Sequence, residues 1–330
     1  MRQYDLVIDP SSRAWLEDHL PNLSGKTALV TGSTQGIGYA IAYLIARAGG
    51  RVIFAVRNVT MAERIIAYFN QNFGENNHGV AHLDLGVLQT TKDAADSLIK
   101  GFNHVDYIFA NAGVVGLPTD CTETGHNRTF FINHIGHFSF LGHLMPLIAR
   151  SKGIKIVLQS SLRHWSAQKD LTFEKYFQKQ EVIPNTVYAD SKLANILFAM
   201  KWSSLCKEQD LDVEMFSAHP GYVLTSINQG THDASMRSIL GSISACEFGS
   251  ACLKLMHRFG LSQPGIIAGS LPSLRAVLDK DAGFYSGPSG FLEVYGLPKD
   301  AAMSRRCYDT KLQDQLWEQS EAFCGVNYFS

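Results

Sequence analysis

A tyrosine and a lysine four residues apart, Tyr188 and Lys192, are the side chains of this sequence best placed for acid–base chemistry. In a helix, this spacing puts both side chains on one face. A free phenol has a pKa of about 10, but a neighbouring ammonium favours the phenolate and should lower that pKa. Tyr188 is therefore a candidate general acid for reducing a carbonyl, or general base for oxidising an alcohol.

Two serines offer a hydrogen-bond donor to the same chemistry. Ser160 and Ser161 directly follow the apolar stretch IKIVLQ, which predicts a strand. A hydroxyl at this point can hold a substrate oxygen while negative charge builds on it. A hydrolytic serine with a histidine partner is the alternative, but the sequence has no G-x-S-x-G turn to support it.

A glycine-rich loop predicts a dinucleotide site. It lies between a predicted strand at 27–31 and a predicted helix at 37–48. In such loops one glycine permits a tight turn, another lets the backbone approach a pyrophosphate, and a third lets helix and strand pack closely. The helix N-terminus then offers free N–H groups to the phosphates. The candidate cofactor-binding residues of this loop are Gly32, Ser33, Gly36, Ile37 and Gly38.

The end of the second predicted strand favours one cofactor over the other. An acidic residue there would accept hydrogen bonds from the ribose 2′-OH of NAD, but the sequence reads Val56-Arg57-Asn58. Arg57 can instead pair with the 2′-phosphate of NADP, and the Ser33 hydroxyl can contact the same phosphate. We therefore expect NADP(H), with NAD(H) as the alternative; a solvated surface arginine is the other interpretation of Arg57.

Further candidates follow the third and fourth predicted strands, where a doubly wound sheet holds its ligand. Asp84 can accept a hydrogen bond from an adenine amino group, and Asn111 can steady the adjoining loop. Turn formation by Asx residues is the alternative for each. The candidates at these two strand ends are Asp84, Leu85, Asn111, Ala112 and Gly113.

Elements that would position these residues alternate along the chain as strand and helix. The predicted strands, nearly all apolar, lie at 27–31, 51–56, 79–85, 105–110, 154–160 and 212–220, and helices lie between them. Continuous apolar strands are expected when helices cover both faces of a parallel sheet. We therefore predict an α/β fold of the Rossmann type, a doubly wound parallel sheet in a single domain. Its expected parts are an N-terminal extension at 1–24, a dinucleotide-binding and catalytic core at 25–225, and a substrate flap with the C-terminal part at 226–330.

Composition and charge exclude several classes of function. The 330 residues carry 29 basic and 30 acidic side chains, which gives no electrostatic footprint for nucleic acid. The start of the chain has no apolar run, and no stretch is long enough to span a membrane. Six scattered cysteines indicate free thiols, and we expect a cytoplasmic protein, with peripheral membrane contact left open. His134, His137 and His143 lack a further ligand, so we expect no metal site.

Together these motifs resemble the short-chain dehydrogenase/reductase family over about Gly25 to Thr225. They comprise TGSTQGIG, NAG, the set of Ser161, Tyr188 and Lys192, and the tripeptide His219-Pro220-Gly221. The resemblance implies that Tyr188 is the acid/base, that Ser161 donates to the substrate oxygen and that Lys192 contacts the nicotinamide ribose. The stretch FINHIGHF resembles the family's central helix, which implies that Asn133 holds a water in the proton relay. The residues implied beside the nicotinamide are Pro220, Gly221, Val223 and Thr225.

One spacing differs from the family's commonest form. Ser161 and Tyr188 are 27 residues apart, roughly twice the usual gap, so an insertion at about 164–184 must lie between them. This is similar to the retinol dehydrogenase-like branch, which includes WW-domain-containing oxidoreductases and resembles light-dependent protochlorophyllide reductases. The insertion leaves the substrate unassigned, because we expect it to border the pocket.

From these features we expect an NADP(H)-dependent oxidoreductase that interconverts a carbonyl and an alcohol on an apolar small molecule. A reductase of a carbon–carbon double bond on the same scaffold is one alternative. A nucleotide-bound regulatory or scaffold protein is another, although a scaffold has no chemical need for Asn133, Ser161, Tyr188 and Lys192 together. We expect the segment after Thr225, including 236–259, to cover the substrate cleft. A homo-oligomer is compatible with the sequence, which shows no distinct interface.

Overall fold

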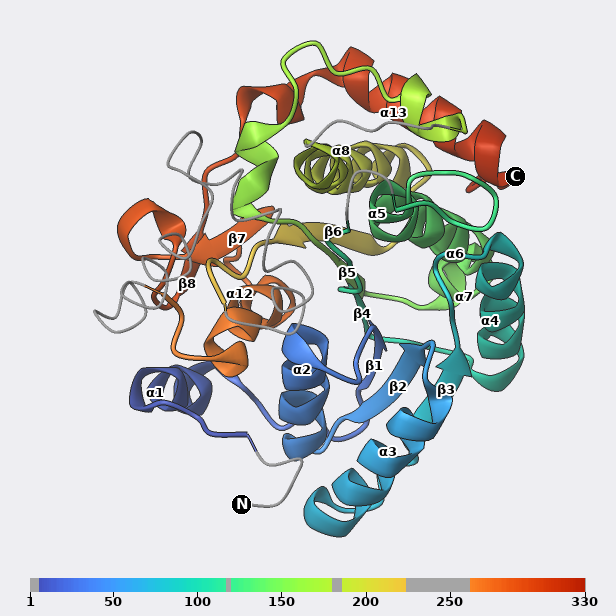
Figure 1. Ribbon diagram of the computed structural model, residues 1–330. Helices are drawn as coiled ribbons and strands as arrows, with labels where there is room; N and C mark the ends of the chain where they lie inside the picture. The colour runs from blue at the N-terminus through green and yellow to red at the C-terminus, as the bar shows by residue number, and fades with distance from the viewer. Residues whose placement is uncertain (1–5, 117–119, 180–185, 224–261, 330) are drawn as a thin grey trace.

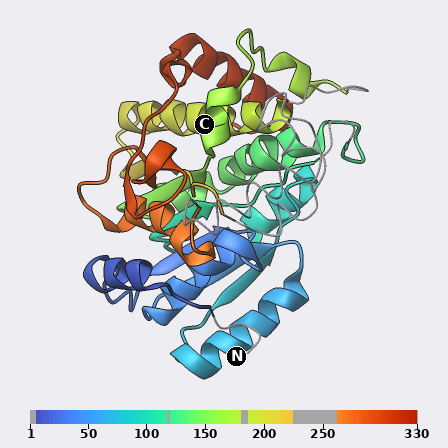
Figure 2. The ribbon, with the colours of Figure 1, turned by 60° about the vertical axis from the view of Figure 1, so that its left-hand side comes forward.

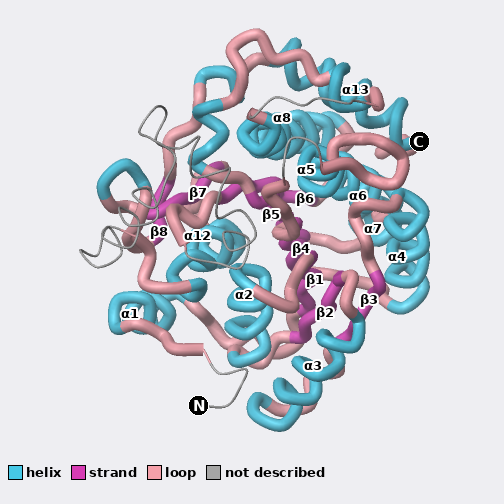
Figure 3. Tube along the Cα trace, viewed as in Figure 1, coloured by secondary structure: helices cyan, strands magenta, loops and turns pink. Residues whose placement is uncertain are grey.

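An eight-stranded sheet forms the centre of the molecule in the computed structural model, which describes residues 6–116, 120–179, 186–223 and 262–329 (Figures 1 and 3). The strand order is β3-β2-β1-β4-β5-β6-β7-β8; all neighbours are parallel except β7 and β8. The strands are β1 (Thr27–Thr31), β2 (Arg51–Val56), β3 (Gly79–His82), β4 (Tyr107–Ala110), β5 (Ile154–Gln159), β6 (Val213–Ala218), β7 (Tyr285–Pro288) and β8 (Pro298–Asp300). The predicted doubly wound parallel sheet is confirmed.

Helices cover both faces of the sheet (Figures 1 and 2). One face carries α1 (Pro10–His19), α2 (Gly36–Arg47), α3 (Val59–Phe73) and α12 (Ile266–Leu278). The other carries α4 (Leu88–Gly101), α5 (Arg128–Phe130), the π-helix η1 (Phe131–Ile135), α6 (Gly136–His143), α7 (Met145–Arg150) and α8 (Val187–Glu208). The last helix, α13 (Thr310–Cys324), packs outside α8. Four 3-10 helices complete the description: η2 (Leu162–Ser166), η3 (Glu174–Phe177), η4 (Phe291–Glu293) and η5 (Arg305–Tyr308).

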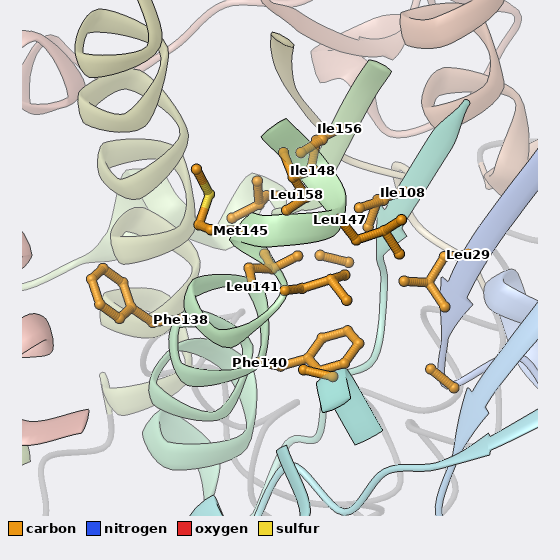
Figure 4. Packing of buried hydrophobic residues seen from close by; sticks show 14 of the residues in the cluster. Leu29, Ile108, Phe138, Phe140, Leu141, Met145, Leu147, Ile148, Ile156 and Leu158 are labelled. Carbon is orange, nitrogen blue, oxygen red and sulfur yellow. The ribbon is translucent and has the colours of Figure 1, made fainter. Parts of the chain in front are cut away.

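Apolar strand residues explain the central position of the sheet. Leu29, Ile108 and Ile156 are fully buried and point toward Phe140 and Leu147 of the covering helices (Figure 4). Burying a side chain of this size contributes about 1.5–3 kcal/mol. A sheet covered on both faces requires strands without a polar face, which is why the strands lack the alternation of a half-exposed sheet.

The predicted elements agree with the structure in the first two thirds of the chain and less well beyond it. β3 ends at His82 rather than at residue 85, and β4 begins at Tyr107. The structure adds β7 and β8, which the sequence analysis did not predict. It also adds α1 within the N-terminal extension, where Trp15 and Leu16 join the buried cluster around α2 and α12.

Three sequence expectations concern residues outside those that the structure describes. They are the position of Thr225, the proposed covering segment at 236–259 and the end of the insertion beyond residue 179. Among the described helices, none combines the length and the apolar character needed to cross a membrane.

Candidate active site

The carboxyl ends of β1, β2, β4, β5 and β6 gather nearly all the described candidate residues at one edge of the sheet. The parallel register explains this, because every strand from β1 to β6 points the same way. Ligands of open α/β sheets bind at this edge. The sequence places the glycine loop after β1, Arg57 after β2, Asn111 after β4, Ser161 after β5 and His219 after β6.

The glycine loop has the shape of a phosphate cradle. Gly32 and Gly36 have φ values of 65° and 59°, in the left-handed region that favours glycine. At Gly38 a Cβ would lie 2.4 Å from the Asn111 Nδ2 atom and 2.6 Å from the Gly32 carbonyl oxygen, so only glycine fits. The loop therefore brings bare backbone to the edge where a pyrophosphate would sit, which fits the dinucleotide expectation.

The N-terminus of α2 supplies the donors of this cradle. Gln35 precedes the helix and makes no side-chain hydrogen bond to its first turn. The N–H groups at the start of α2, including that of Ile37, are thus not satisfied by a capping side chain and are available to an anion. Ser33 differs from the expectation in detail, because its side chain is fully buried and its hydroxyl donates to the Val30 carbonyl oxygen at 3.0 Å.

Arg57 lies directly after β2 with its side chain exposed. Within the part of the chain that the structure describes, no carboxylate pairs with its guanidinium. A cation at this strand end suits a 2′-phosphate and would be poorly suited to a ribose 2′-OH alone.

Asp84 and Leu85 are placed by a local turn. The Gly86 N–H donates to the Asp84 Oδ1 atom at 2.9 Å, and the Asp84 N–H donates to the Thr90 hydroxyl oxygen at 3.1 Å. This is the Asx turn considered as the alternative, and it leaves the second carboxylate oxygen of Asp84 able to accept. Leu85 is buried, and its carbonyl oxygen packs against Gly136.

The segment Asn111-Ala112-Gly113 is tied to β1. The Asn111 Nδ2 atom donates to the Thr31 carbonyl oxygen at 3.1 Å, and the Ala112 N–H donates to the Thr31 hydroxyl at 2.9 Å. A Cβ at Gly113 would lie 3.3 Å from the Lys192 Nζ atom. Asn111 therefore steadies the loop beside the glycine cradle, and Gly113 leaves room for the lysine.

Ser161 and Tyr188 meet although 27 residues separate them in the sequence. The Ser161 hydroxyl lies near enough to the Tyr188 phenol to lower its pKa. Ser161 caps η2 by accepting from the Arg163 N–H at 3.2 Å, whereas Ser160 is buried and donates to the Lys192 carbonyl oxygen at 2.8 Å. Of the two serines, Ser161 alone faces the tyrosine.

Lys192 is buried on the first turns of α8. Its Nζ atom donates to the Gln159 carbonyl oxygen at 3.1 Å and lies 5.6 Å from the centre of the Tyr188 ring. Burial lowers the pKa of Lys192 to about 8, because an ammonium loses its hydration in the interior. The i, i+4 spacing on one helix face is as the sequence indicated.

The electrostatics of Tyr188 differ from the sequence expectation. Burial raises the pKa of the phenol above its ordinary value, while the hydrogen bond from Ser161 and the positive charge of Arg163 lower it in part. Arg163, on the turn that follows Ser161, supplies one positive charge near the phenol. The Lys192 ammonium lies 5.6 Å from the centre of the Tyr188 ring and donates to the Gln159 carbonyl oxygen.

Asn133 lies in the π-helix η1, fully buried. Its side chain accepts from the Val114 N–H at 2.8 Å and donates to the Val114 carbonyl oxygen at 3.0 Å and to the Ser191 hydroxyl at 3.0 Å. The His137 Nδ1 atom lies 3.2 Å from the Asn133 carbonyl oxygen. π-Helical turns are rare in proteins, and many of those that occur lie at functional sites. Asn133 thereby joins η1, the loop after β4 and α8.

The turn after β6 carries the remaining described candidates. Gly221 has a φ of 70°, Val223 is buried, and Pro220 is half-buried. The Tyr222 N–H donates to the Val294 carbonyl oxygen at 2.7 Å, so a loop from the C-terminal third holds this turn.

Two of the three histidines that we did not expect to bind a metal lie against hydroxyl groups. The His134 Nε2 atom lies 2.9 Å from the Ser320 hydroxyl, and the His137 Nε2 atom lies 3.0 Å from the Thr31 hydroxyl. Burial lowers the pKa of His134 to about 3 and that of His137 to about 4. His143 is half-buried.

Sequence reasoning missed several residues that hold the site. His164 Nδ1 donates to the Ser161 carbonyl oxygen at 2.8 Å, since its Nε2 accepts from the Ser304 N–H at 3.2 Å. The Tyr285 hydroxyl, on the unpredicted strand β7, lies 3.4 Å from the His164 Nδ1 atom. Ser304 and Tyr285 lie in the C-terminal third of the sequence, so no local spacing relates them to the site. The Gly- and Pro-containing stretch GFYSGPSGF, at residues 283–291, was the one sequence feature that marked this region.

Comparisons with known proteins place the chain among the short-chain dehydrogenases. A family model for short chain dehydrogenases matches residues 26–172. Human retinol dehydrogenase 13 is 27% identical over 304 residues, covering 92% of this chain and 86% of the relative. The WW domain-containing oxidoreductase of Drosophila melanogaster is 32% identical over 231 residues, covering 66% of this chain and 54% of the relative.

A solved structure supports the fold over nearly the whole chain. It is that of an uncharacterised protein from Mycobacterium paratuberculosis, with a TM-score of 0.70 at 24% identity. The match covers 94% of this chain and 97% of that one, so the C-terminal third is included in the shared architecture.

Proposed function

This chain belongs to the short-chain dehydrogenase/reductase family of NAD(P)-dependent oxidoreductases, which act on CH–OH or C=O groups, and from that premise we propose that it is an NADP(H)-dependent carbonyl reductase or alcohol dehydrogenase. Tyr188 is the proposed acid/base. The observation that carries the proposal is the placement of the buried Lys192 ammonium 5.6 Å from the centre of the Tyr188 ring on α8, with the Ser161 hydroxyl near enough to lower the pKa of the phenol.

The protein's own groups would handle the proton and the substrate oxygen. The bound nicotinamide cofactor supplies or accepts the hydride. In the reductive direction Tyr188 donates its phenolic proton to the substrate oxygen, and Ser161 holds that oxygen by a hydrogen bond as charge develops. In the oxidative direction the phenolate accepts the proton instead.

The positive charges near Tyr188 make its phenol easier to ionise than it would be through burial alone. Arg163 already favours the phenolate form of Tyr188. Lys192, with its pKa lowered to about 8, can give up or hold a proton near neutrality. Asn133, whose side chain bridges Val114 and Ser191, is the proposed holder of a water that completes the proton path.

NADP(H) is the preferred cofactor in this proposal. The exposed guanidinium of Arg57 at the end of β2 and the absence of an acidic residue in Val56-Arg57-Asn58 support it. The proposed contacts along the cofactor are the glycine loop, Asp84, the Asn111 segment, Lys192 and the turn after β6, with Thr225 as a further sequence-based candidate.

The proposed substrate is an apolar aldehyde, ketone or secondary alcohol. Trp165, on the same 3-10 helix that Ser161 caps, is 52% exposed and offers an aromatic surface at that end of the site. The name of the human relative, a retinol dehydrogenase, is consistent with an apolar alcohol.

Fluorescence titration with NADPH and NADH tests the cofactor assignment in wild type and Arg57→Ala. We expect wild type to prefer NADPH and the variant to lose that preference, weakening NADPH about tenfold or more, as expected for a charge-assisted phosphate contact. Arg13→Ala is a matched control, because exposed Arg13 lies by the opposite, C-terminal end of α2. Equal binding of both cofactors, unchanged in Arg57→Ala, would remove the NADP(H) assignment.

Trans-2-octenal then tests the reaction, because it contains both a carbonyl and a carbon–carbon double bond. Formation of octenol with NADPH supports carbonyl reduction, and formation of octanal supports the double-bond alternative. Tyr188→Phe should abolish either product while leaving NADPH binding intact. If wild type binds neither cofactor, the proposed function fails and a scaffold role takes its place.

A further inference from the structure

Glu293 is a half-buried acid that the proposed chemistry does not use, and its backbone is unusual. It ends η4, between β7 and β8. Leu292 and Glu293 both have positive φ values, 51° and 57°. The left-handed region is unfavourable for a residue with a Cβ atom. Such backbone persists where surrounding contacts fix it, and it is frequent at functional sites.

The contacts of the Glu293 carboxylate are specific. Its Oε2 atom lies 3.2 Å from the Nε2 atom of His219, and its Oε1 atom accepts from the Ala302 N–H at 3.0 Å. The His219 side chain is fully buried and that of Glu293 is 17% exposed. Burial alone would raise the pKa of Glu293, but the hydrogen bonds from His219 and Ala302 bring it below its ordinary value.

The tautomer of His219 follows from its two partners. The Gly221 N–H donates to the His219 Nδ1 atom at 3.3 Å, so this nitrogen is the acceptor. The Nε2 atom must then carry the proton and donate it to Glu293. Without the carboxylate, the Nε2–H group would be buried and unpaired, which is costly. Glu293 therefore fixes both the tautomer and the orientation of the ring that supports Gly221.

Neighbouring contacts make Glu293 one end of a clamp on the turn after β6. The Tyr222 N–H donates to the Val294 carbonyl oxygen at 2.7 Å. A Cβ at Gly221 would lie only 2.4 Å from that same oxygen. On the other side of His219, a Cβ at position 287 would lie 2.0 Å from the Nε2 atom, so only glycine fits against the ring.

A second side chain closes the clamp from the opposite side. Gln263 is buried, and its Nε2 atom donates to the Pro220 carbonyl oxygen at 3.4 Å and to the Gly296 carbonyl oxygen at 3.2 Å. Its own N–H donates to the Tyr222 carbonyl oxygen at 3.0 Å. The turn is thus held through backbone atoms by the C-terminal third of the chain.

We propose that Glu293 is a positioning residue for the nicotinamide half of the cofactor, acting through His219 on the turn at Pro220 and Gly221. It does not touch the cofactor itself. The inference rests on the proposed function, in which this turn lies beside the nicotinamide. It assigns a role to an acid that is 74 residues from its partner in the sequence.

Two ligands separate positioning from a general effect on folding. NADPH carries both the nicotinamide and the adenine half, whereas adenosine 2′,5′-bisphosphate carries the adenine half alone. In Glu293→Ala we expect the Kd for NADPH to rise about tenfold, the loss typical of a hydrogen bond to a charged group. The Kd for adenosine 2′,5′-bisphosphate should stay within about twofold, because the glycine loop and Arg57 are untouched.

Glu293→Gln is the conservative variant. Its amide oxygen can still accept from the His219 Nε2–H, so we expect a selective loss for NADPH of only about threefold. The emission of bound NADPH gives a second readout, and its enhancement should fall in Glu293→Ala and recover in Glu293→Gln. Glu318→Ala, an exposed acid on α13, is the matched control and should change neither ligand.

The outcomes are distinct. If Glu293→Ala raises the Kd of NADPH and of adenosine 2′,5′-bisphosphate equally, or raises neither, the inference is overturned while the proposed function stands. If Glu293→Ala does not fold, the selective effect in Glu293→Gln decides, and its absence overturns the inference. Wild type that binds neither ligand refutes the proposed function first, and the inference with it.

Discussion

The Ser160 hydroxyl donates a 2.8 Å hydrogen bond to the carbonyl oxygen of Lys192, one turn of helix beyond Tyr188. Its neighbour Ser161 has an extended backbone, with φ of −159° and ψ of 155°, and its hydroxyl reaches the phenol instead. Consecutive side chains of extended backbone point in opposite directions. Ser160 therefore fastens α8 to the end of β5, and Ser161 is left for the substrate role that we propose for it.

Separate alanine substitutions of Ser160 and Ser161 should distinguish an effect on stability from an effect on catalysis. In Ser161→Ala we expect kcat/KM for aldehyde reduction to fall about 10²-fold, as when one donor to a developing oxyanion is removed. In Ser160→Ala we expect activity within a few-fold of wild type and a loss of about 1 kcal/mol in the free energy of unfolding. Steady-state NADPH oxidation and urea unfolding measure the two effects. The reverse pattern would mean that Ser160 is the catalytic serine.

Gly38→Ala should damage the cofactor cradle by steric conflict. The new Cβ would lie 2.6 Å from the Gly32 carbonyl oxygen, a backbone atom that cannot move without distorting the loop. We expect a loss of about 2 kcal/mol in the free energy of unfolding, as for overpacked sites, and weaker NADPH binding. Differential scanning fluorimetry with and without NADPH measures both effects.

Gly101 provides the matched control for that experiment. It is the last residue of α4, and a Cβ there would meet no atom within 4 Å. Gly101→Ala should therefore be neutral or stabilise the fold by about 0.5 kcal/mol, through a less flexible unfolded chain. Equal behaviour of the two variants would show that Gly38 is not sterically required.

Asp190 should prove to be the anchor of the insertion. This fully buried carboxylate accepts from the Gln168 N–H at 2.8 Å, the Tyr176 hydroxyl at 2.5 Å and the Thr186 hydroxyl at 3.1 Å. Asp190→Ala leaves those donors unpaired, so we expect a loss of about 3 kcal/mol in the free energy of unfolding. Urea denaturation followed by tryptophan fluorescence measures it, with exposed Asp170→Ala as the control.

A double-mutant cycle with Tyr176→Phe isolates the strongest of these contacts. Both residues are buried and in direct contact, so their losses should not add. A coupling energy near zero would contradict the anchoring role of the carboxylate.

The fold was predictable from the sequence where apolar strands alternate with helices. The stretches at 27–31 and 51–56 became β1 and β2 with unchanged bounds. β7 was not predictable, because Tyr285–Pro288 contains Gly and Pro and is a strand through its pairing with β6 and β8. The same holds for β8, an edge strand of three residues that depends on β7.

The candidate site was predictable as far as its residues follow strands or share a helix face. Ser161 and Tyr188 were assigned by motif, and the structure brings them into contact. Their electrostatics were only partly predictable, because Arg163, which lowers the pKa of Tyr188, is placed by the way η2 turns after Ser161. The Glu293–His219 pair was equally hidden, since it exists only after β7 and η4 have packed against β6.

Burying the Lys192 ammonium costs free energy, which a methionine at the same position would not. Burial lowers its pKa from 10.5 to about 8, so the folded state binds fewer protons than the unfolded state between these two pH values. Unfolding free energy therefore rises with pH across this window, and the full cost of the buried ammonium is present below pH 8. At pH 7 the shift corresponds to about 3 kcal/mol, partly offset by the hydrogen bond to Gln159.

Lys192→Met should accordingly raise the free energy of unfolding at pH 7 by about 2 kcal/mol while abolishing turnover, as expected when a strained functional group is removed. The difference between variant and wild type should shrink as the pH rises from 8 toward 10.5, because wild-type Lys192 then enters the interior uncharged. Urea titrations of both proteins at pH 7 and pH 10 measure this difference. A stability difference that is independent of pH would show that the lysine is not buried as a charged group, and a less stable variant would show that the Gln159 contact outweighs the desolvation.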